Sequence, residues 1–233
     1  MEQKTIDQSL QKILDSFDPS KLMTTEQQKA AQEAAEAEQK ENIRKERINA
    51  LAVPKRLKLG REHLSDGNHW RGAFDQLKEA IGTGTIIAIR GKPGTGKSQM
   101  AAELLYHGVE EKELTGLFIT FTDLQLEVKS TFNTVNSEAS VIKRLIKPDM
   151  LVIDEFDWLH EKSAEVTDNY WQSILYHIIN KRYYDMKDTI LTSNKSLDDF
   201  KKTTITPIKS RITETGYLVN TDDWTDFRRE IPF

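Results

Sequence analysis

The sequence predicts an α/β fold in which helices cover both faces of a parallel five-stranded sheet, preceded by a small helical region. Three observations lead to this prediction. Short apolar segments alternate with amphipathic ones after residue 62, a glycine-rich loop follows the first apolar segment, and 37% of the 233 residues are hydrophobic, enough for one core. We place a helical, partner-binding region and a basic linker at residues 1–61, and the α/β domain at residues 62–233.

The N-terminal region is rich in Gln, Ala, Glu and Lys and lacks β-branched runs, which indicates helical or loosely ordered chain. Thr5 and Gln8 form a capping box at the start of a first amphipathic helix. One face of this helix carries Ile6, Leu10, Ile13, Leu14 and Phe17. That face either packs on the rest of the chain or docks a partner. A second helical stretch near residues 26–51 has few large apolar residues, so we expect a solvated arm.

Basic side chains gather between this arm and the α/β domain. They are Arg44, Lys45, Arg47, Lys55, Arg56, Lys58 and Arg61. Such a segment can contact nucleic acid or an acidic partner, but runs of like charge are more often solvated surface. Both interpretations stay open at this point.

After the linker, the hydrophobic pattern switches repeatedly between short buried runs and longer amphipathic segments. We expect strands near residues 85–90, 116–121, 149–154, 188–193 and 216–220. We expect helices near residues 71–81, 97–109, 122–132, 138–146, 163–182 and 204–213. Strands that alternate with helices in this way favour a parallel sheet sandwiched between helices.

A glycine-rich loop follows the first strand. It matches the pattern G-x-x-x-x-G-K-[ST] and consists of Gly91, Lys92, Pro93, Gly94, Thr95, Gly96, Lys97 and Ser98. The glycines let backbone N–H groups surround a phosphate at the N-terminus of the next helix. Lys97 adds a cation for the β- and γ-phosphates, and the Ser98 hydroxyl is placed to ligate Mg²⁺. The sequence therefore predicts that ATP and Mg²⁺ bind here, because a chance match between a strand and a helix is the weaker interpretation.

A second motif predicts hydrolysis. The apolar strand that begins near Met150 ends in the adjacent carboxylates Asp154 and Glu155, a Walker B pattern. Asp154 would hold Mg²⁺, and Glu155 would orient and deprotonate the attacking water. The alternative is that the two carboxylates only cap the following helix. Beside an intact phosphate loop, the catalytic interpretation is the stronger one.

Two later residues are further candidates for the chemistry. Asn194 ends the strand near residues 188–193, where its amide could sense the γ-phosphate or help to position the water. The alternative is an Asn that simply terminates a strand. Arg211 lies near the end of the helix before the last strand and is a candidate arginine finger for the nucleotide of a neighbouring subunit. A single arginine on a helix is otherwise usually solvated.

Composition limits the remaining function classes. The formal net charge of −4 argues against a uniformly basic nucleic-acid-binding protein but leaves room for a local basic groove. The absence of cysteine excludes disulfides and thiolate zinc sites, and the five histidines have no metal-ligand spacing. No apolar run is long enough to span a bilayer, and the first residues lack a hydrophobic signal core. We therefore expect a cytoplasmic protein without a membrane partner.

Taken together, these motifs resemble the AAA+ ATPases of the DnaC type, the bacterial and phage replicative helicase loaders. The resemblance covers roughly residue 62 to the end. It rests on the phosphate loop, Leu151–Glu155, Thr192–Asn194, Ser210–Arg211 and Trp224–Arg229. It implies an AAA+ P-loop αβα sandwich with strand order 5-1-4-3-2. It also implies that Asn194 is sensor 1 and that Arg211 acts in trans, which requires self-association through the ATPase interface.

The same resemblance implies partners. The protein would bind a hexameric replicative helicase, with the N-terminal helix as the docking element, and would help to place it on single-stranded DNA. Phe121, Lys129 and Phe132 would then stack on bases and contact phosphates. The alternative is that both phenylalanines are core and that Lys129 is solvated. The sequence ends at Phe233, soon after the last strand, so we expect no C-terminal lid, as in loaders of this type.

Three other functions remain open from the sequence. An IstB-like transposition helper would share the ATPase core and act with a transposase on duplex DNA. A metabolic P-loop kinase would need a lid and an acceptor pocket, and we identify neither in the sequence. An adaptor would bind ATP without hydrolysing it, and a phosphate-release assay would distinguish it.

Overall fold

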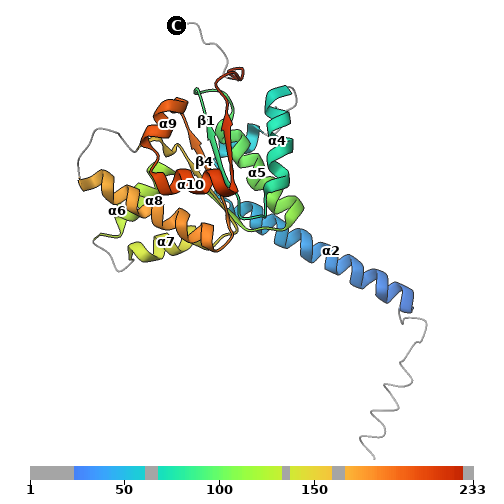
Figure 1. Ribbon diagram of the computed structural model, residues 1–233. Helices are drawn as coiled ribbons and strands as arrows, with labels where there is room; N and C mark the ends of the chain where they lie inside the picture. Colours follow the sequence, from blue (N-terminus) through green and yellow to red (C-terminus); the bar gives the residue numbers. More distant parts are fainter. Residues whose placement is uncertain (1–23, 61–67, 133–136, 159–165, 228–233) are drawn as a thin grey trace, which may run out of the picture. The chain divides into compact units, whose positions relative to one another are not determined.

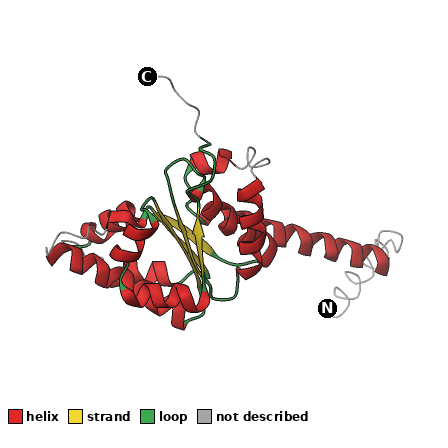
Figure 2. Ribbon diagram, turned by 45° about the horizontal axis from the view of Figure 1, so that its top comes forward, coloured by secondary structure: helices red, strands yellow, loops and turns green. Residues whose placement is uncertain are grey.

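The computed structural model describes residues 24–60, 68–132, 137–158 and 166–227. The chain divides into two compact units, Met1–Ile43 and Arg44–Phe233. The second unit is a three-layer αβα structure, with a parallel sheet between two layers of helices (Figures 1 and 2). Among the described residues, no helix combines the length and the apolar character needed to cross a membrane.

The sheet has five strands in the order β2-β3-β4-β1-β5, and every pair of neighbours is parallel. The strands are β1 (Ile86–Arg90), β2 (Gly116–Thr120), β3 (Met150–Asp154), β4 (Asp188–Ser193) and β5 (Tyr217–Asn220). Read from the other edge, this order is the predicted 5-1-4-3-2, which is confirmed. The order brings the carboxyl ends of β3, β4 and β1 together, so side chains at these three ends can form one site.

Alternate residues of the strands face two separate hydrophobic clusters. On β1, Ile86 and Ala88 belong to one cluster, whereas Ile87 and Ile89 belong to the other. Every residue of β1, β3 and β4 is buried, as expected for strands covered by helices on both faces. The strand β5 lies at an edge and alternates in exposure, with Leu218 44% exposed.

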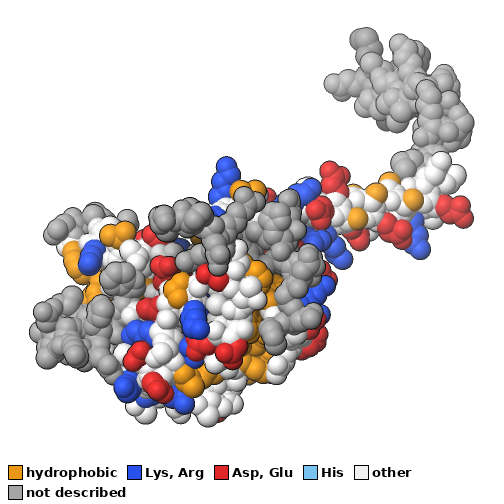
Figure 3. All heavy atoms as spheres, turned by 90° about the horizontal axis from the view of Figure 1, so that it is seen from above, with side chains coloured by type: hydrophobic (Ala, Val, Ile, Leu, Met, Phe, Trp, Pro, Cys, Tyr) orange, Lys and Arg blue, Asp and Glu red, His pale blue; other side chains and the backbone are white. Residues whose placement is uncertain are grey.

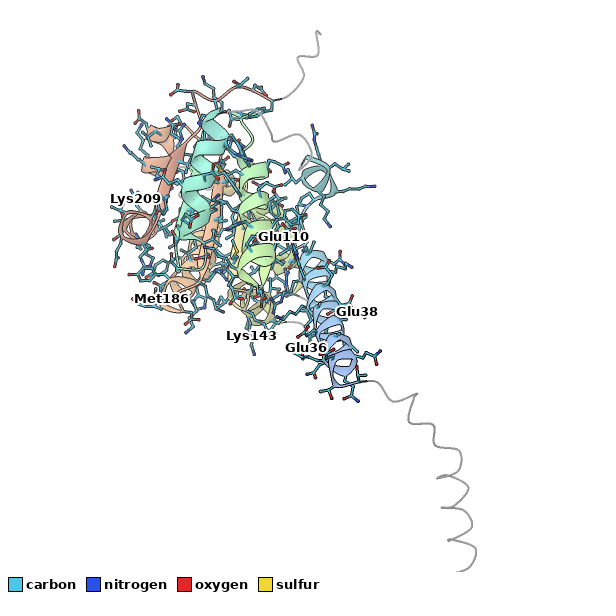
Figure 4. The ribbon with its side chains drawn as sticks, turned by 90° about the vertical axis from the view of Figure 1, so that its right-hand side faces the viewer. Glu36, Glu38, Glu110, Lys143, Met186 and Lys209 are labelled. Carbon is cyan, nitrogen blue, oxygen red and sulfur yellow. The ribbon has the colours of Figure 1, made fainter. Side chains whose placement is uncertain are left out.

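Each face of the sheet has its own layer of helices. One cluster includes residues of α4 (Asn68–Ala80) and α5 (Lys97–Lys112), and α3 (Lys55–Gly60) packs against α5. The other cluster is built by α6 (Phe121–Ser130), α7 (Glu138–Ile146), α8 (Val166–Tyr184), α9 (Leu197–Thr203) and α10 (Thr206–Thr215). In Figure 4 the label Glu110 marks α5 of the first layer, and the label Lys209 marks α10 of the second.

Two short helices were not predicted. α9 begins after Ser196, whose hydroxyl accepts the backbone N–H of Asp199 at 3.1 Å, and it buries Phe200 in the core. α3 lies within the predicted basic linker, where the carbonyl of Leu57 accepts a hydrogen bond from the Gln99 side chain of α5 at 2.9 Å. Part of the linker is therefore packed structure, although its basic side chains Lys55, Arg56 and Lys58 are exposed.

The boundary between units also differs from the predicted one at residue 61. Leu51 is fully buried and Val53 nearly so, both in the cluster that contains α5. The carbonyl of Leu51 accepts the N–H of Phe118 on β2 at 2.7 Å. Because these residues complete the core, the α/β unit begins well before residue 62.

Helix α2 (Thr25–Ala50) occupies the stretch predicted as a solvated arm. Thr24 and Gln27 form a capping box at its start: the Gln27 N–H donates to the Thr24 hydroxyl at 3.3 Å, and the Thr24 N–H donates to the Gln27 side chain at 2.9 Å. None of its residues is buried. The predicted first helix, with its Ile6–Phe17 face, lies outside the described residues.

Candidate nucleotide-binding site

The glycine-rich loop joins β1 to α5, as its strand and helix neighbours predict. Gly94 and Gly96 have φ values of 88° and 81°, in the left-handed region that favours glycine. Gly96 is the N-cap of α5 and makes no side-chain cap hydrogen bond. The first N–H groups of α5 therefore lack a side-chain cap at the positive end of the helix, which is the arrangement that binds phosphate.

Lys97 is held inside this loop. Its side chain is only 5% exposed, and its ammonium donates to the carbonyl oxygen of Lys92 at 2.6 Å. The Thr95 hydroxyl donates to the same carbonyl at 2.9 Å. The loop thus surrounds its own lysine, and the ammonium is close to the backbone that would enclose phosphates.

The two predicted metal ligands lie next to each other. The Ser98 hydroxyl donates to Oδ1 of Asp154 at 2.8 Å, and the Thr192 hydroxyl of β4 donates to the same oxygen. Asp154 is 7% exposed, and this burial raises the pKa of its carboxyl, while the hydrogen bonds from Thr192 and Ser98 act in the opposite direction. Since the Asp154 carboxylate bonds to the loop and to β4, it does not serve as a cap for the following helix.

Glu155 differs from its neighbour in both backbone and exposure. Its φ is 55°, a left-handed conformation that costs a non-glycine residue roughly 1–3 kcal/mol. The Thr192 hydroxyl accepts its N–H at 3.0 Å and so holds this conformation. The side chain is exposed at the end of β3, directly after the buried Asp154. The two carboxylates therefore have the different environments that a metal ligand and a base require.

Asn194 lies at the end of β4, and its side chain is exposed. Its N–H donates to Oδ2 of Asp157 at 2.5 Å, and the Ser193 hydroxyl donates to Oδ1 of the same carboxylate. Asp157 belongs to the 3-10 helix Phe156–Trp158 that follows β3. This aspartate fixes the tip of β4 beside β3, and it escaped sequence analysis because its partners are defined only by the fold.

A C-terminal segment, Thr221–Phe227, lies against the loop. The hydroxyls of Thr221 and Thr95 are hydrogen-bonded at 2.7 Å, and the Phe227 N–H donates to the carbonyl of Gly94 at 3.0 Å. A Cβ added at Gly94 would lie 2.0 Å from Oδ1 of Asp226. The sequence marked this ending only through its resemblance to a family. The structure adds that the segment Thr221–Phe227 is hydrogen-bonded to the phosphate loop.

The contacts that Arg211 makes within its own chain lie outside the phosphate loop. It lies on α10, and its guanidinium donates to the carbonyl of Pro207 at 2.9 Å and to the side chain of Asn180 on α8. It is half-buried. The contacts described for Arg211 are with α8 and α10, so the structure does not bring it to the phosphate loop of the same chain.

The predicted DNA contacts are divided by burial. Phe121 is 0% exposed and packs edge-to-face on Trp171, so the prediction that its ring stacks on a base is wrong. Phe132 is 58% exposed beside Tyr170, at a ring distance of 6.3 Å. The Lys129 ammonium lies 5.9 Å from the centre of the Trp171 ring. Phe132 and Lys129 therefore remain accessible candidates.

Comparison with known proteins assigns the family. The model of the family "IstB-like ATP binding protein" matches residues 79–209, more than half of the chain. The chain belongs to this IstB-like family. The match covers β1 through the first turn of α10, including the phosphate loop and both Walker B carboxylates. Membership therefore rests on the part of the molecule that contains the candidate site.

The IstB-like chain is also similar to individual proteins. It is 28% identical over 164 residues to the replicative helicase loader DnaC of Escherichia coli K12, and this match covers 68% of the chain and 62% of DnaC. A crystal structure of the DnaC helicase loader matches with a TM-score of 0.59 and 21% identity, over 72% of this chain and 100% of that one. The replication initiator DnaA, bound to AMPPCP and single-stranded DNA, matches with a TM-score of 0.55 and 17% identity, over 73% and 51%. The DnaC and DnaA structures share the AAA+ fold with this chain.

Proposed function

We propose that this protein is an ATP-dependent loader that binds a replicative DNA helicase and helps to place it on single-stranded DNA, with ATP binding and hydrolysis as the switch. The observation that carries the proposal is the similarity to DnaC over a segment that contains Ser98 and Asp154. In the structure the Ser98 hydroxyl donates to Oδ1 of Asp154 at 2.8 Å. The matched segment spans 62% of DnaC, so the partners are part of the proposal.

The residues of the loop fit ATP and Mg²⁺. The uncapped N-terminus of α5 offers N–H groups to phosphate, and the buried Lys97 supplies a cation among them. Ser98 and Asp154 are the oxygen ligands that would hold Mg²⁺, and burial raises the pKa of the Asp154 carboxyl, although the hydrogen bonds from Thr192 and Ser98 and the charge of Lys97 act in the opposite direction. When bound, the metal ion would neutralise charge on the phosphates.

Three side chains would carry the hydrolysis. Glu155 would accept a proton from the attacking water, since its side chain is exposed at the end of β3, directly after the buried Asp154. Asn194, held at the tip of β4, would orient that water or contact the γ-phosphate. Arg211 of a neighbouring copy would stabilise the charge that develops on the transferred phosphoryl group. Self-association through the ATPase interface follows from this role.

Contact with single-stranded DNA would be local. On the face seen in Figure 3, basic and acidic side chains are interspersed, in keeping with the net charge of −4. We therefore propose that Phe132 stacks on a base and that Lys129 contacts a phosphate. The buried Phe121 would anchor this segment in the core. The structural likeness to DnaA in its complex with single-stranded DNA supports a nucleic-acid role for this fold.

The first experiment mixes the purified chain with the replicative helicase of its host, with and without ATP, and measures the mass of the complex by light scattering after size exclusion. We expect a complex whose mass depends on ATP, and we expect Lys97→Ala to remove that dependence. Glu155→Gln should retain ATP binding and lose phosphate release. An active ATPase that forms no complex with the helicase would contradict the loader function.

A second function is favoured by the family match itself. An IstB-like protein would assist a transposase on duplex DNA, and the IstB-like model covers residues 79–209. Fluorescence anisotropy with labelled single-stranded and duplex oligonucleotides of equal length separates the two functions. A loader should prefer the single strand and lose affinity with Phe132→Ala, whereas a transposition helper should prefer the duplex and associate with the transposase.

A further inference from the structure

The side chain of Arg211 is fixed by a cage of residues from α8 and α10. One terminal nitrogen donates to the carbonyl of Pro207 at 2.9 Å, and the other donates to Oδ1 of Asn180. The guanidinium lies 5.5 Å from the ring centre of Tyr176 and 5.0 Å from that of Tyr183. The two hydrogen bonds thus fix the guanidinium within its plane, and the two aromatic rings add cation–π contacts.

One wall of the cage is itself anchored to α10. The Tyr183 hydroxyl donates to Oε1 of Glu214 at 2.8 Å, which ties the ring to the helix that carries Arg211. Arg211, Tyr176, Asn180 and Tyr183 are all half-buried, so the cage reaches the protein surface. A group on another molecule can therefore approach the guanidinium without unfolding of α8 or α10.

The hydrogen-bond inventory of the guanidinium leaves donors for such a group. Each terminal nitrogen of arginine carries two N–H groups, and the contacts to Pro207 and Asn180 use one on each. The Nε–H of Arg211 also lacks a partner among the described residues, but it is buried, so the donors left for another molecule are the second N–H groups of the two terminal nitrogens. A long side chain normally loses rotamer freedom when it binds a phosphate, but Arg211 has lost this freedom on folding. The cage therefore preorganises the remaining donors.

We infer that Asn180 is a positioning residue, which with Tyr176 and Tyr183 holds Arg211 in the orientation that reaches the nucleotide of a neighbouring copy of this chain. This inference rests on the proposed role of Arg211 as an arginine finger in trans. Asn180 touches no nucleotide itself. Its carboxamide oxygen acts only through the guanidinium, and the location on α8 makes it separate from the phosphate loop of its own chain.

The experiment mixes two inactive variants of the full chain. Glu155→Gln lacks the base but retains Arg211, and Arg211→Ala lacks the finger but retains the base. A mixture contains interfaces in which the intact base of one subunit meets the intact Arg211 of its neighbour, so phosphate release should recover. Recovery in this mixture tests the proposed trans role by itself. If the mixture of Glu155→Gln and Arg211→Ala does not recover phosphate release, the finger assignment fails before Asn180 is tested.

Asn180→Leu is then placed in one subunit at a time. In the Glu155→Gln subunit, which supplies the finger, it should lower the recovered kcat by roughly tenfold or more with little change in KM, because a hydrogen bond to a charged group is lost. In the Arg211→Ala subunit, which has no finger, the same substitution should change nothing. Asn180→Asp keeps the acceptor oxygen and should restore most of the activity.

The matched placements separate positioning from folding. Any general loss of stability from Asn180→Leu would appear equally in both subunits, and thermal denaturation of each variant measures it directly. Equal kcat values for the two placements, beside a clear loss for Arg211→Ala, would overturn the role of Asn180 and leave Arg211 as the finger. A loss confined to the finger-supplying subunit, with rescue by Asn180→Asp, is the expected result.

Discussion

Replacing Arg182 by methionine should remove a large part of the stability of the α/β unit. Arg182 is fully buried near the end of α8 and has hydrogen-bond acceptors on three other segments. These acceptors are the Thr189 hydroxyl and the carbonyls of Leu145, Ile146, Pro148, Asp149 and Asp188. The guanidinium therefore ties α8 to the starts of β3 and β4, the strands whose far ends build the nucleotide site.

The magnitude follows from two opposing effects. Burial lowers the pKa of Arg182 to about 10 from 12.5, and since one pKa unit is about 1.4 kcal/mol, the charged form pays about 3 kcal/mol for its position. The hydrogen bonds offset this cost in the folded protein. Methionine removes the charge but leaves several buried carbonyls without a donor, at roughly 1–3 kcal/mol each where no relaxation occurs. We expect a net loss of about 3–5 kcal/mol.

The assay is equilibrium unfolding in urea, followed by tryptophan fluorescence. Arg144→Met is the matched control, because Arg144 forms an ion pair with Glu127 in which both side chains are nearly half exposed, and its loss should cost at most about 1 kcal/mol. If Arg182→Met does not fold, Arg182→Lys gives the answer, since it keeps the charge without the forked donors and should lose about 2 kcal/mol. Equal losses for the Arg182 and Arg144 variants would refute the reasoning.

The remaining predictions concern two glycines and the metal ligand. Gly216→Ala would place a Cβ 1.8 Å from the carbonyl oxygen of Ile86, so it should lower the free energy of unfolding by more than about 3 kcal/mol. Gly72 has open space around it on α4, so Gly72→Ala should raise the free energy of unfolding by about 0.5–1 kcal/mol. Thermal denaturation measures both effects. Burial raises the pKa of Asp154 above 3.8, so this carboxyl stabilises the metal-free fold at acid pH, and the contribution is lost as the pH rises through the raised pKa. Asp154→Asn should therefore gain stability over the wild type between acid and neutral pH in urea titrations without Mg²⁺, while losing phosphate release; a difference that stays constant with pH would contradict this.

Local pattern was enough to predict the strands and the phosphate loop. β1 and β3 are apolar runs that end in one charged residue, because both faces of the sheet are covered, and this covering is itself predicted by alternation with helices. β4 is equally buried, but Ile190 and Leu191 are its apolar residues. Ser98 and Asp154 are separated by more than fifty residues, yet each lies at a fixed place in its own motif, so their contact could be predicted once the strand order was known.

Residues whose partners come from the tertiary fold could not be predicted in this way. Arg182 bonds mostly to backbone carbonyls, which leave no side-chain pattern in the sequence. Phe121 was assigned to DNA, but the Thr120 hydroxyl accepts the Asp123 N–H at 3.0 Å and starts α6 directly at Phe121, which turns the ring into the core. The division of the structure after Ile43 differs from the sequence-based boundary near residue 61, because the burial of Leu51 depends on contact with β2 and α5.

The candidate site depends on the Thr192 hydroxyl, whose hydrogen bonds the sequence motifs did not predict. Thr192 donates to Asp154 and accepts the N–H of Glu155, so a single side chain on β4 holds both the proposed metal ligand and the strained backbone of the proposed base. Asn194 lies two residues after Thr192, directly beyond the end of β4. A ligand that changes the hydrogen bonding of Asp154 must therefore act on Thr192, and through it on Glu155 and the tip that bears Asn194. The strand order that places β4 between β3 and β1 makes this coupling possible, because β4 alone among the described strands pairs with both.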